Sequence, residues 1–225
     1  MGIEEKLNKI LLVSESNELI HPSKPGKFAE EIKDTSEKAF QRAILFAKYT
    51  KLNDKVNSVV NWYDIELPVV LNKNSRRQCI DLIGYETNRF VLCELKYNNK
   101  KDSPIAATRE LLEYYRLILK NAEYLDKYSI HHSNDMCNKV WQWTSVLKDN
   151  PLLVIAANEK YWKDWKKKKN LDFNKQLQEI KAWSIELGID IVLYNIEDID
   201  FIGQKNKQSS YWPKLDTNRP WIRIN

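Results

Sequence analysis

The stretch that decides the fold consists of two apolar runs joined by a polar turn: Cys79-Ile80-Asp81-Leu82-Ile83-Gly84, then Glu86-Thr87-Asn88-Arg89, then Phe90-Val91-Leu92-Cys93-Glu94-Leu95-Lys96. Short apolar runs on either side of a polar turn are typical of two antiparallel strands. Three charged residues, Asp81, Glu94 and Lys96, lie inside these runs. Because burying an unpaired charge is costly, the three side chains need a shared reason to be there.

The spacing of these three residues predicts that they meet at one end of the strand pair. Strand side chains alternate between two faces, so Glu94 and Lys96 project from the same face, about 7 Å apart. The short turn brings Asp81 alongside them. A metal site explains this grouping best, and carboxylate oxygens favour Mg²⁺ or Mn²⁺. The alternative is an internal ion-pair cluster that fixes the strand register without chemistry.

An Asp on one strand and Glu-x-Lys on the next resembles the motif of the PD-(D/E)XK nuclease superfamily; here the residues are Asp81 and Glu94-Leu95-Lys96. The resemblance implies a restriction-endonuclease-like α/β fold with an αβββαβ core, in which helices flank a mixed sheet. It also implies that Asp81 and Glu94 bind magnesium and that the backbone carbonyl of Leu95 is a further ligand. Lys96 is then catalytic, and the implied reaction is hydrolysis of nucleic-acid phosphodiesters.

In this superfamily a glutamate of the first core helix often completes the metal site. We expect that helix within residues 27–49, and Glu37 lies on the inward side of its apolar stripe. Glu37 is therefore our first choice as the additional ligand, against the alternative of a solvated glutamate favoured by the helix dipole. Glu30 and Glu31 are alternatives on the same helix, and Glu66 is a further alternative on the first predicted strand.

The order of the expected elements agrees with the resemblance. Hydrophobic periodicity predicts the following segments: a helix over 3–13, a helix within 27–49, strands over 57–71, 79–84 and 90–97, a helix from Pro104, a strand over 152–157, helical sequence through Trp162 and Trp165, a helix over 172–187 and a strand over 189–194. Residues 122–150 are expected to be a helical insertion with loops. We expect one domain: a core over about 27–194, an N-terminal helix and loop over 1–26, and a C-terminal extension over 195–225.

The helix that begins at Pro104 is expected to pack its apolar stripe on the sheet. Four polar residues are expected on its other side: Arg109, Glu113, Arg116 and Lys120. Its Glu110 and Tyr114 resemble a Gln-x-x-x-Tyr signature that follows the Glu-x-Lys strand in several branches of the superfamily, with Glu110 replacing the glutamine. The two side chains either support Lys96 or cover the sheet.

Basic residues around the site are candidates for contacts with a nucleic-acid backbone. The chain has a formal net charge of +5 and a pI near 8.9, which fits a polyanion binder as well as many other proteins. Four residues in turns beside the site could contact phosphates: Arg76, Arg77, Lys100 and Lys101. In the aromatic and lysine-rich stretch 161–169, the tryptophans are expected to be core anchors. DNA is the expected partner and RNA the alternative, and a homodimer would suit double-strand cleavage.

Composition adds limits on the class of protein. With 43% hydrophobic and 30% charged residues, the chain falls outside the low-apolar class of disordered proteins. Three cysteines, Cys79, Cys93 and Cys137, lack a C-x-x-C pair and are expected to be reduced. We expect a cytoplasmic protein with no membrane span. Within these limits, the resemblance to PD-(D/E)XK nucleases implies a magnesium-dependent nuclease acting on DNA, or alternatively a catalytically inactive nucleic-acid- or protein-binding module on the same fold.

Overall fold

The structure of the protein, a computed structural model, describes residues 1–13, 37–53, 58–70, 78–87, 89–98, 102–127, 141–148, 150–168, 172–196, 200–202 and 212–225. The two apolar runs form the antiparallel strands β3 (Gln78–Glu86) and β4 (Arg89–Lys96). Their ladder begins at the pair Glu86 and Arg89, and Thr87 has a φ of 51° in the turn. This left-handed conformation is what a tight connection between antiparallel strands requires.

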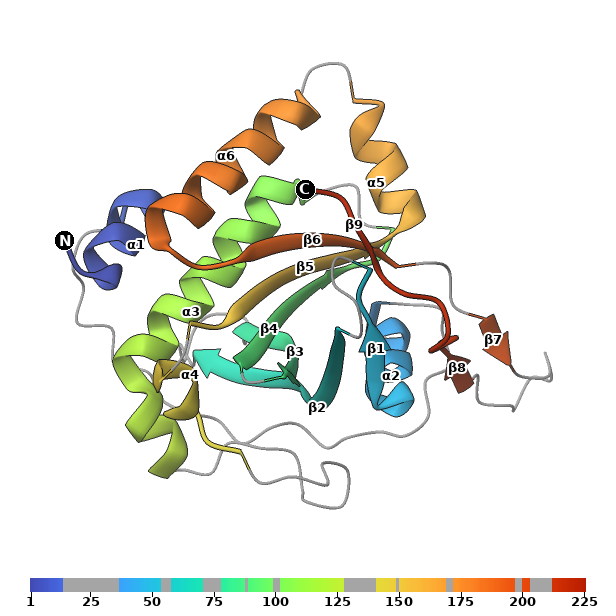
Figure 1. The fold of residues 1–225 in the computed structure, drawn as a ribbon, viewed down its shortest axis with the longest axis horizontal. Helices are drawn as coiled ribbons and strands as arrows, with labels where there is room; N and C mark the ends of the chain where they lie inside the picture. The colour runs from blue at the N-terminus through green and yellow to red at the C-terminus, as the bar shows by residue number, and fades with distance from the viewer. Residues whose placement is uncertain are drawn as a thin grey trace.

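The strands β3 and β4 lie in the middle of a mixed, curled seven-stranded sheet with the order β1-β2-β3-β4-β5-β6-β9 (Figure 1). The other members are β1 (Tyr49–Lys51), β2 (Val59–Val70), β5 (Leu152–Asn158), β6 (Ile191–Ile196) and β9 (Ile222–Arg223). β1 to β4 are antiparallel neighbours, β4 to β6 run parallel, and β9 is antiparallel to β6. A separate pair contains β7 (Asp200–Ile202) and β8 (Trp212–Lys214).

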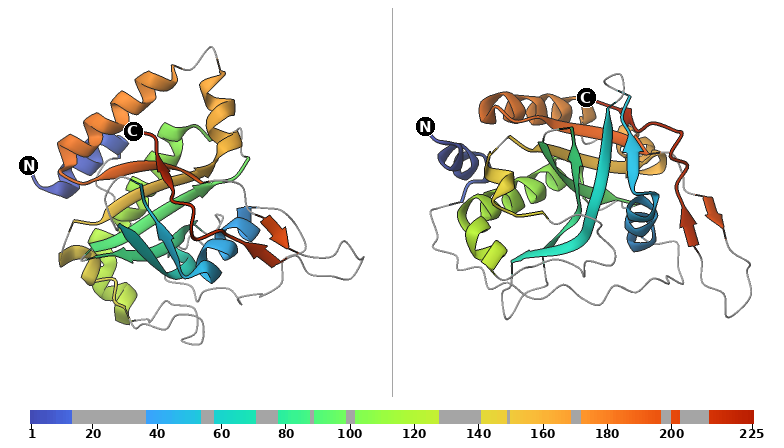
Figure 2. Two further views of the ribbon diagram at one scale, coloured as in Figure 1. Left: turned by 45° about the vertical axis from the view of Figure 1, so that its right-hand side comes forward. Right: turned by 60° about the horizontal axis from the view of Figure 1, so that its bottom comes forward.

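Helices cover both faces of the sheet (Figure 2). One face packs against α2 (Glu37–Ala47). On the opposite side, a second core lies beneath four further helices: α1 (Ile3–Leu11), α3 (Pro104–Lys127), α5 (Glu159–Lys166) and α6 (Phe173–Leu187). A short helix, α4 (Ser145–Lys148), packs beside α3 and β4. Each of these helices contributes an apolar stripe to one of two hydrophobic cores, one on each side of the sheet.

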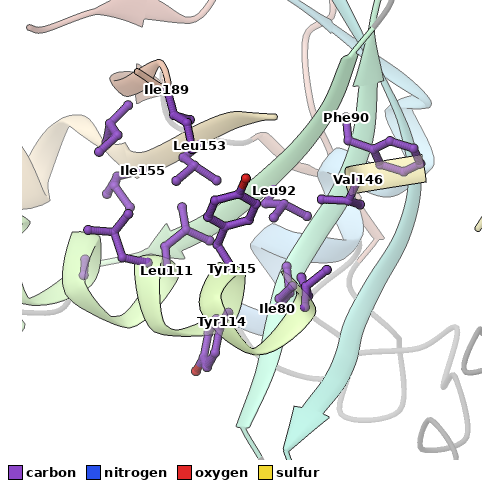
Figure 3. Close-up of a cluster of buried hydrophobic side chains, with 14 of the residues drawn as sticks. Ile80, Phe90, Leu92, Leu111, Tyr114, Tyr115, Val146, Leu153, Ile155 and Ile189 are labelled. Carbon is purple, nitrogen blue, oxygen red and sulfur yellow. The ribbon is translucent and has the colours of Figure 1, made fainter. Parts of the chain in front are cut away.

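The central strand β4 divides its side chains between these two cores. Phe90 and Leu92 belong to the core beneath α3, whereas Val91, Cys93 and Leu95 belong to the core beneath α2. Figure 3 shows part of the α3 core, where Tyr115 points from α3 toward Leu92 and Tyr114 points to the other side of the helix. By the same alternation, the next even positions of β4 belong to the α3 side. Those positions are Glu94 and Lys96.

The two edges of the sheet meet through Trp221. Its backbone N–H donates to the carbonyl of Lys51 at 2.8 Å, and its carbonyl accepts from the N–H of Asn53 at 3.1 Å. The indole ring is 2% exposed and packs against Trp62 and Tyr194, with ring centroids 5.4 and 6.2 Å away. The residues just after β1 therefore pair with those just before β9, and the sheet curls into a nearly closed ring.

Most of the expected elements are confirmed within the described residues. Their helices and strands lie within a few residues of the predicted bounds, although α3 continues to Lys127, into the stretch assigned to an insertion. Trp162 and Trp165 are 2% and 3% exposed, which confirms them as core anchors. None of the described helices combines the length and apolar character needed to cross a membrane. Cys79 and Cys93 form no disulfide in the described part of the chain, and Cys137 lies outside it.

One position on α3 was predicted wrongly. Arg116 was expected on the polar side of the helix, but its side chain is 1% exposed. A buried arginine is tolerated where its charge is paired, and here the partner is Glu113 on the same helix. The guanidinium group is held by two hydrogen bonds to Glu113, at 2.9 and 2.5 Å, which replace its contacts with water.

Candidate active site

The candidate site lies where β3 and β4 part. Their ladder ends at the pair Leu82 and Cys93, after which β3 stays with β2 and β4 stays with β5. Asp81 is the first residue of β3 beyond this point, and its Oδ2 accepts a hydrogen bond of 2.7 Å from the N–H of Leu95. A side-chain carboxylate thus replaces the backbone partner that a continuous ladder would have supplied. The separation of the strands also lets residues of α2 and α3, on opposite faces, reach the same cluster.

Asp81 is anchored from both sides. In addition to the bond from Leu95, its Oδ1 accepts a hydrogen bond of 2.6 Å from Nε2 of Gln41 on α2. Burial and the negative charge of Glu37 raise the pKa of Asp81 to about 7, and the Leu95 N–H and the Lys96 charge only partly offset them. The carboxylate is therefore held firmly in place, but nearby positive charge does not fully compensate its burial.

Glu94 has one satisfied and one unsatisfied oxygen. Its Oε1 accepts from Nζ of Lys96 at 2.6 Å, in an ion pair whose side chains are 5% and 6% exposed. Its Oε2 is buried and has no hydrogen-bond partner among the described residues. Burial and the nearby charge of Asp81 raise the pKa of Glu94 well above its usual range. An unpartnered buried oxygen of this kind is costly, so a further donor or cation at Oε2 would stabilise the site.

Lys96 lies between a buried and a half-exposed carboxylate. Its Nζ is 2.6 Å from Glu94, 3.3 Å from Oε2 of Glu110, and 4.0 Å from Oδ2 of Asp102. Burial alone would lower the pKa of Lys96, but the charges of Glu94 and Glu110 more than offset it and raise the pKa. The side chain is thus a permanent ammonium ion at this site.

Glu110 contacts Lys96 directly, and Tyr114 contacts Glu110. The hydroxyl of Tyr114 donates to Oε1 of Glu110 at 2.7 Å, which leaves Oε2 of Glu110 facing Lys96. Burial and the nearby carboxylates, Glu94 first among them, raise the pKa of Tyr114, so its hydroxyl keeps the proton that it donates. Tyr114 is 3% exposed and also covers the core, so both of its expected roles apply.

Glu37 reaches the site from the first turn of α2. Its Oε2 accepts a hydrogen bond of 3.0 Å from the N–H of Tyr97, the residue after Lys96. Burial raises the pKa of Glu37, although the positive charge of Lys96 opposes this effect. Sequence reasoning selected Glu37 but missed Gln41. The available signal was its position one turn after Glu37, which places the two side chains on the same face of the helix.

Of the other acidic candidates, Glu66 is paired with a lysine of α2, and Glu30 and Glu31 lie outside the described residues. Glu66 has a φ of 48° in β2, and its carboxylate forms an ion pair of 3.4 Å with Lys38 on α2.

The chain that leaves the site after β4 is tied to α5. The N–H of Asn98 donates to Oδ1 of Asn158 at 3.2 Å, and Nδ2 of Asn158 donates back to Oδ1 of Asn98 at 2.9 Å. The hydroxyl of Tyr161 donates to the carbonyl of Asp102 at 2.9 Å. These bonds fix the chain at Asn98 and at Asp102.

All four predicted phosphate contacts lie outside the described residues: Arg76, Arg77, Lys100 and Lys101.

The donor set suits a divalent cation, although a ready-made cage is not present. Within the residues that the structure describes, there is no group of three or more His, Cys, Asp or Glu side chains already arranged around a metal position. The unpartnered oxygen of Glu94 nevertheless remains available as an acceptor, and burial raises the pKa values of Asp81, Glu94 and Glu37, so a nearby cation would stabilise their ionised forms. Carboxylate oxygens are the ligands that Mg²⁺ and Mn²⁺ prefer. These residues therefore fit the predicted metal.

Comparison with known proteins yields no relative, since no protein-family model, curated protein or solved structure matches the chain. Function is therefore inferred from the chemistry of the site.

Proposed function

We propose that the chain is a magnesium-dependent nuclease that hydrolyses phosphodiester bonds of DNA, built on a restriction-endonuclease-like αβββαβ core. The observation that carries this proposal is the cluster of Asp81, Glu94 and Lys96 at the parting of β3 and β4, with Oε2 of Glu94 buried and unpartnered. The order α2, β2, β3, β4, α3, β5 supports it, because the same order follows from the resemblance to PD-(D/E)XK nucleases.

Asp81 and Glu94 would hold the Mg²⁺ or Mn²⁺ ion, with the carbonyl of Leu95 and the carboxylate of Glu37 as further ligands. A bound divalent cation supplies positive charge to the phosphate and lowers the pKa of a coordinated water. The hydrogen bonds from Gln41 and from the Leu95 N–H hold the Asp81 carboxylate in place for this role. Rigid support of this kind is what a metal site needs from the residues around it.

Lys96 supplies the fixed positive charge of the proposed reaction. Its ammonium group is almost fully buried, and positive charge is worth more there than in water as negative charge develops on the phosphate. Glu110, held by Tyr114, orients Lys96 from the open side of the site. Arg76, Arg77, Lys100 and Lys101 remain our candidates for contacts with the phosphates that flank the scissile bond.

The first test is cleavage of circular and linear DNA, single- and double-stranded, and of RNA, with Mg²⁺, Mn²⁺ or a chelator. We expect cleavage only with metal, and we expect Asp81→Asn, Glu94→Gln and Lys96→Ala each to lower the rate by about 10²–10⁴-fold. Glu123→Gln, an exposed change on α3, is the matched control and should cleave normally. Full activity in the three site variants, with folding verified by circular dichroism, would exclude this assignment.

A second candidate function is a catalytically inactive nucleic-acid- or protein-binding module on the same fold. The observation that favours it is the ion pair of 2.6 Å between Lys96 and Glu94, which could hold the end of the sheet together without a metal. DNA binding that weakens with salt and ignores metal, combined with absence of cleavage on every substrate, would support this alternative.

A further inference from the structure

We propose that Lys96 is an internal counter-ion that competes with the metal for Glu94, and that Glu110 receives the Lys96 ammonium group when the metal binds. This inference rests on the proposed metal site and describes how that site is regulated. Glu110 is then a positioning residue, because it acts on Glu94 only through Lys96.

The metal and Lys96 compete because the Lys96 ammonium group already lies against the Glu94 carboxylate. Glu94 is almost fully buried, so water cannot replace its partner, and the Lys96 ammonium at 2.6 Å is the positive group on Oε1. A metal ion that uses the Glu94 carboxylate must approach a group already paired with a cation. Two cations on one buried carboxylate repel each other, so the metal and the short Lys96 contact oppose one another.

Glu110 is placed to relieve this conflict. Its Oε2 is already 3.3 Å from Nζ of Lys96, and its side chain is 42% exposed, so Glu110 lies on the solvent side of the site. Tyr114 fixes the other oxygen at 2.7 Å, so Oε2 stays directed at Lys96. A small displacement of the ammonium group toward Glu110 would release Glu94 while keeping Lys96 paired. Asp102, at 4.0 Å, adds a second acceptor on the same side.

Two variants should therefore change metal affinity in opposite directions. Lys96→Met removes the competing cation, so Glu94 should bind metal more tightly even though the metal-free protein loses an ion pair. Glu110→Gln removes the alternative acceptor, so Lys96 should stay on Glu94 and metal should bind more weakly. Because general structural damage would weaken binding in both variants, a gain in affinity for Lys96→Met is a result that damage cannot produce.

The experiment is a calorimetric titration of the metal-free, 225-residue chain with MnCl₂ at constant ionic strength. We expect Lys96→Met to tighten Mn²⁺ binding by about tenfold and Glu110→Gln to weaken it by about fivefold. In the double variant, Glu110→Gln should change affinity by less than about twofold, because its effect passes through Lys96. Glu123→Gln, exposed on the same helix, should bind like the unaltered protein.

Each failure has a distinct meaning. Absence of Mn²⁺ binding by the unaltered protein would overturn the proposed metal site itself. A second failure is that the unaltered protein binds Mn²⁺ but Glu110→Gln weakens binding equally in the presence of Lys96 and in the Lys96→Met variant. Glu110 would then act on the metal directly, and only the inference would be overturned. Weaker binding by folded Lys96→Met would also overturn it. If thermal melting shows that Lys96→Met is unfolded, Lys96→Gln replaces it in the same cycle.

Discussion

Asp81 is a residue of the site whose protonation state depends on pH, because its pKa is raised to about 7. Its two hydrogen-bond donors hold the carboxylate in place, but burial and the charge of Glu37 make its ionised form unfavourable in the metal-free protein. The pKa of about 7 lies above the value near 3.9 expected in the unfolded chain. Between these two values the folded state binds more protons than the unfolded state.

Stability of the metal-free protein should therefore have a component that is present below about pH 4 and is lost as pH rises to about 7. The largest change that Asp81 alone could cause is about 4 kcal/mol. Asp81→Asn cannot ionise, so its free energy of unfolding should fall less over this range. Urea denaturation with a chelator, from pH 4.5 to 7.5, measures the difference between the two proteins. Parallel pH profiles would contradict the assigned shift.

At the same scale, the site could be predicted only where the sequence carries a local pattern. Asp81, Glu94 and Lys96 stand out as charges within apolar strands, and the structure brings them together. Gln41 carries only the weaker signal of its position one turn after Glu37, because a glutamine on a helix is ordinarily solvated. The burial of Arg116 depends on tertiary packing around α3, which the periodicity of one helix does not contain.

Among the elements, β3 shows how tightly the antiparallel part of the sheet is packed. Gly84 pairs with Trp62 in β2, and a Cβ atom at Gly84 would lie 2.7 Å from the carbonyl oxygen of Asn61 and 2.8 Å from the side chains of Trp62 and Val60. The Asn61 carbonyl belongs to the backbone of β2, so it cannot move aside for a Cβ atom as a flexible side chain could. A glycine is therefore required here by close approach.

Gly84→Ala should destabilise the protein by about 1–3 kcal/mol, the usual cost of overpacking a well-filled core. Gly2→Ala is the matched control, because a Cβ atom at Gly2 would meet no atom within 4 Å. Chemical denaturation followed by tryptophan fluorescence measures both variants. Equal stability of the two alanine variants would show that β2 and β3 can separate locally.

Long elements with a clear hydrophobic period could be predicted from sequence, whereas the shortest strands could not. The helix α6 and the strands β4 and β5 carry enough apolar positions to define their own type. The strands β1 and β9 contain three and two residues, and they exist because their neighbours pair with them. Short strands of this kind are set by tertiary contacts rather than by propensity.

For the whole molecule, Trp221 is the residue on which closure of the sheet depends. It contributes backbone bonds to the segment after β1 and a buried ring between Trp62 and Tyr194. Removing the ring would leave a cavity between the two ends of the sheet.

Trp221→Ala should cost about 3–5 kcal/mol of stability, as expected for a buried tryptophan. Ile222→Ala, one residue away and 42% exposed, is the matched control and should cost much less. Urea denaturation compares the two variants. A loss below about 1 kcal/mol in Trp221→Ala would mean that the ring contributes little to closure.

The closure contact also has a consequence for synthesis. The N–H of Arg223 donates to Oδ1 of Asn53 at 2.8 Å across 170 positions of the sequence. A chain emerging from the ribosome therefore exposes β1 long before the residues that cover its edge become available. During that interval the β1 edge can pair with other chains. Nascent chains should depend on chaperones most in the period just before Trp221 leaves the exit tunnel.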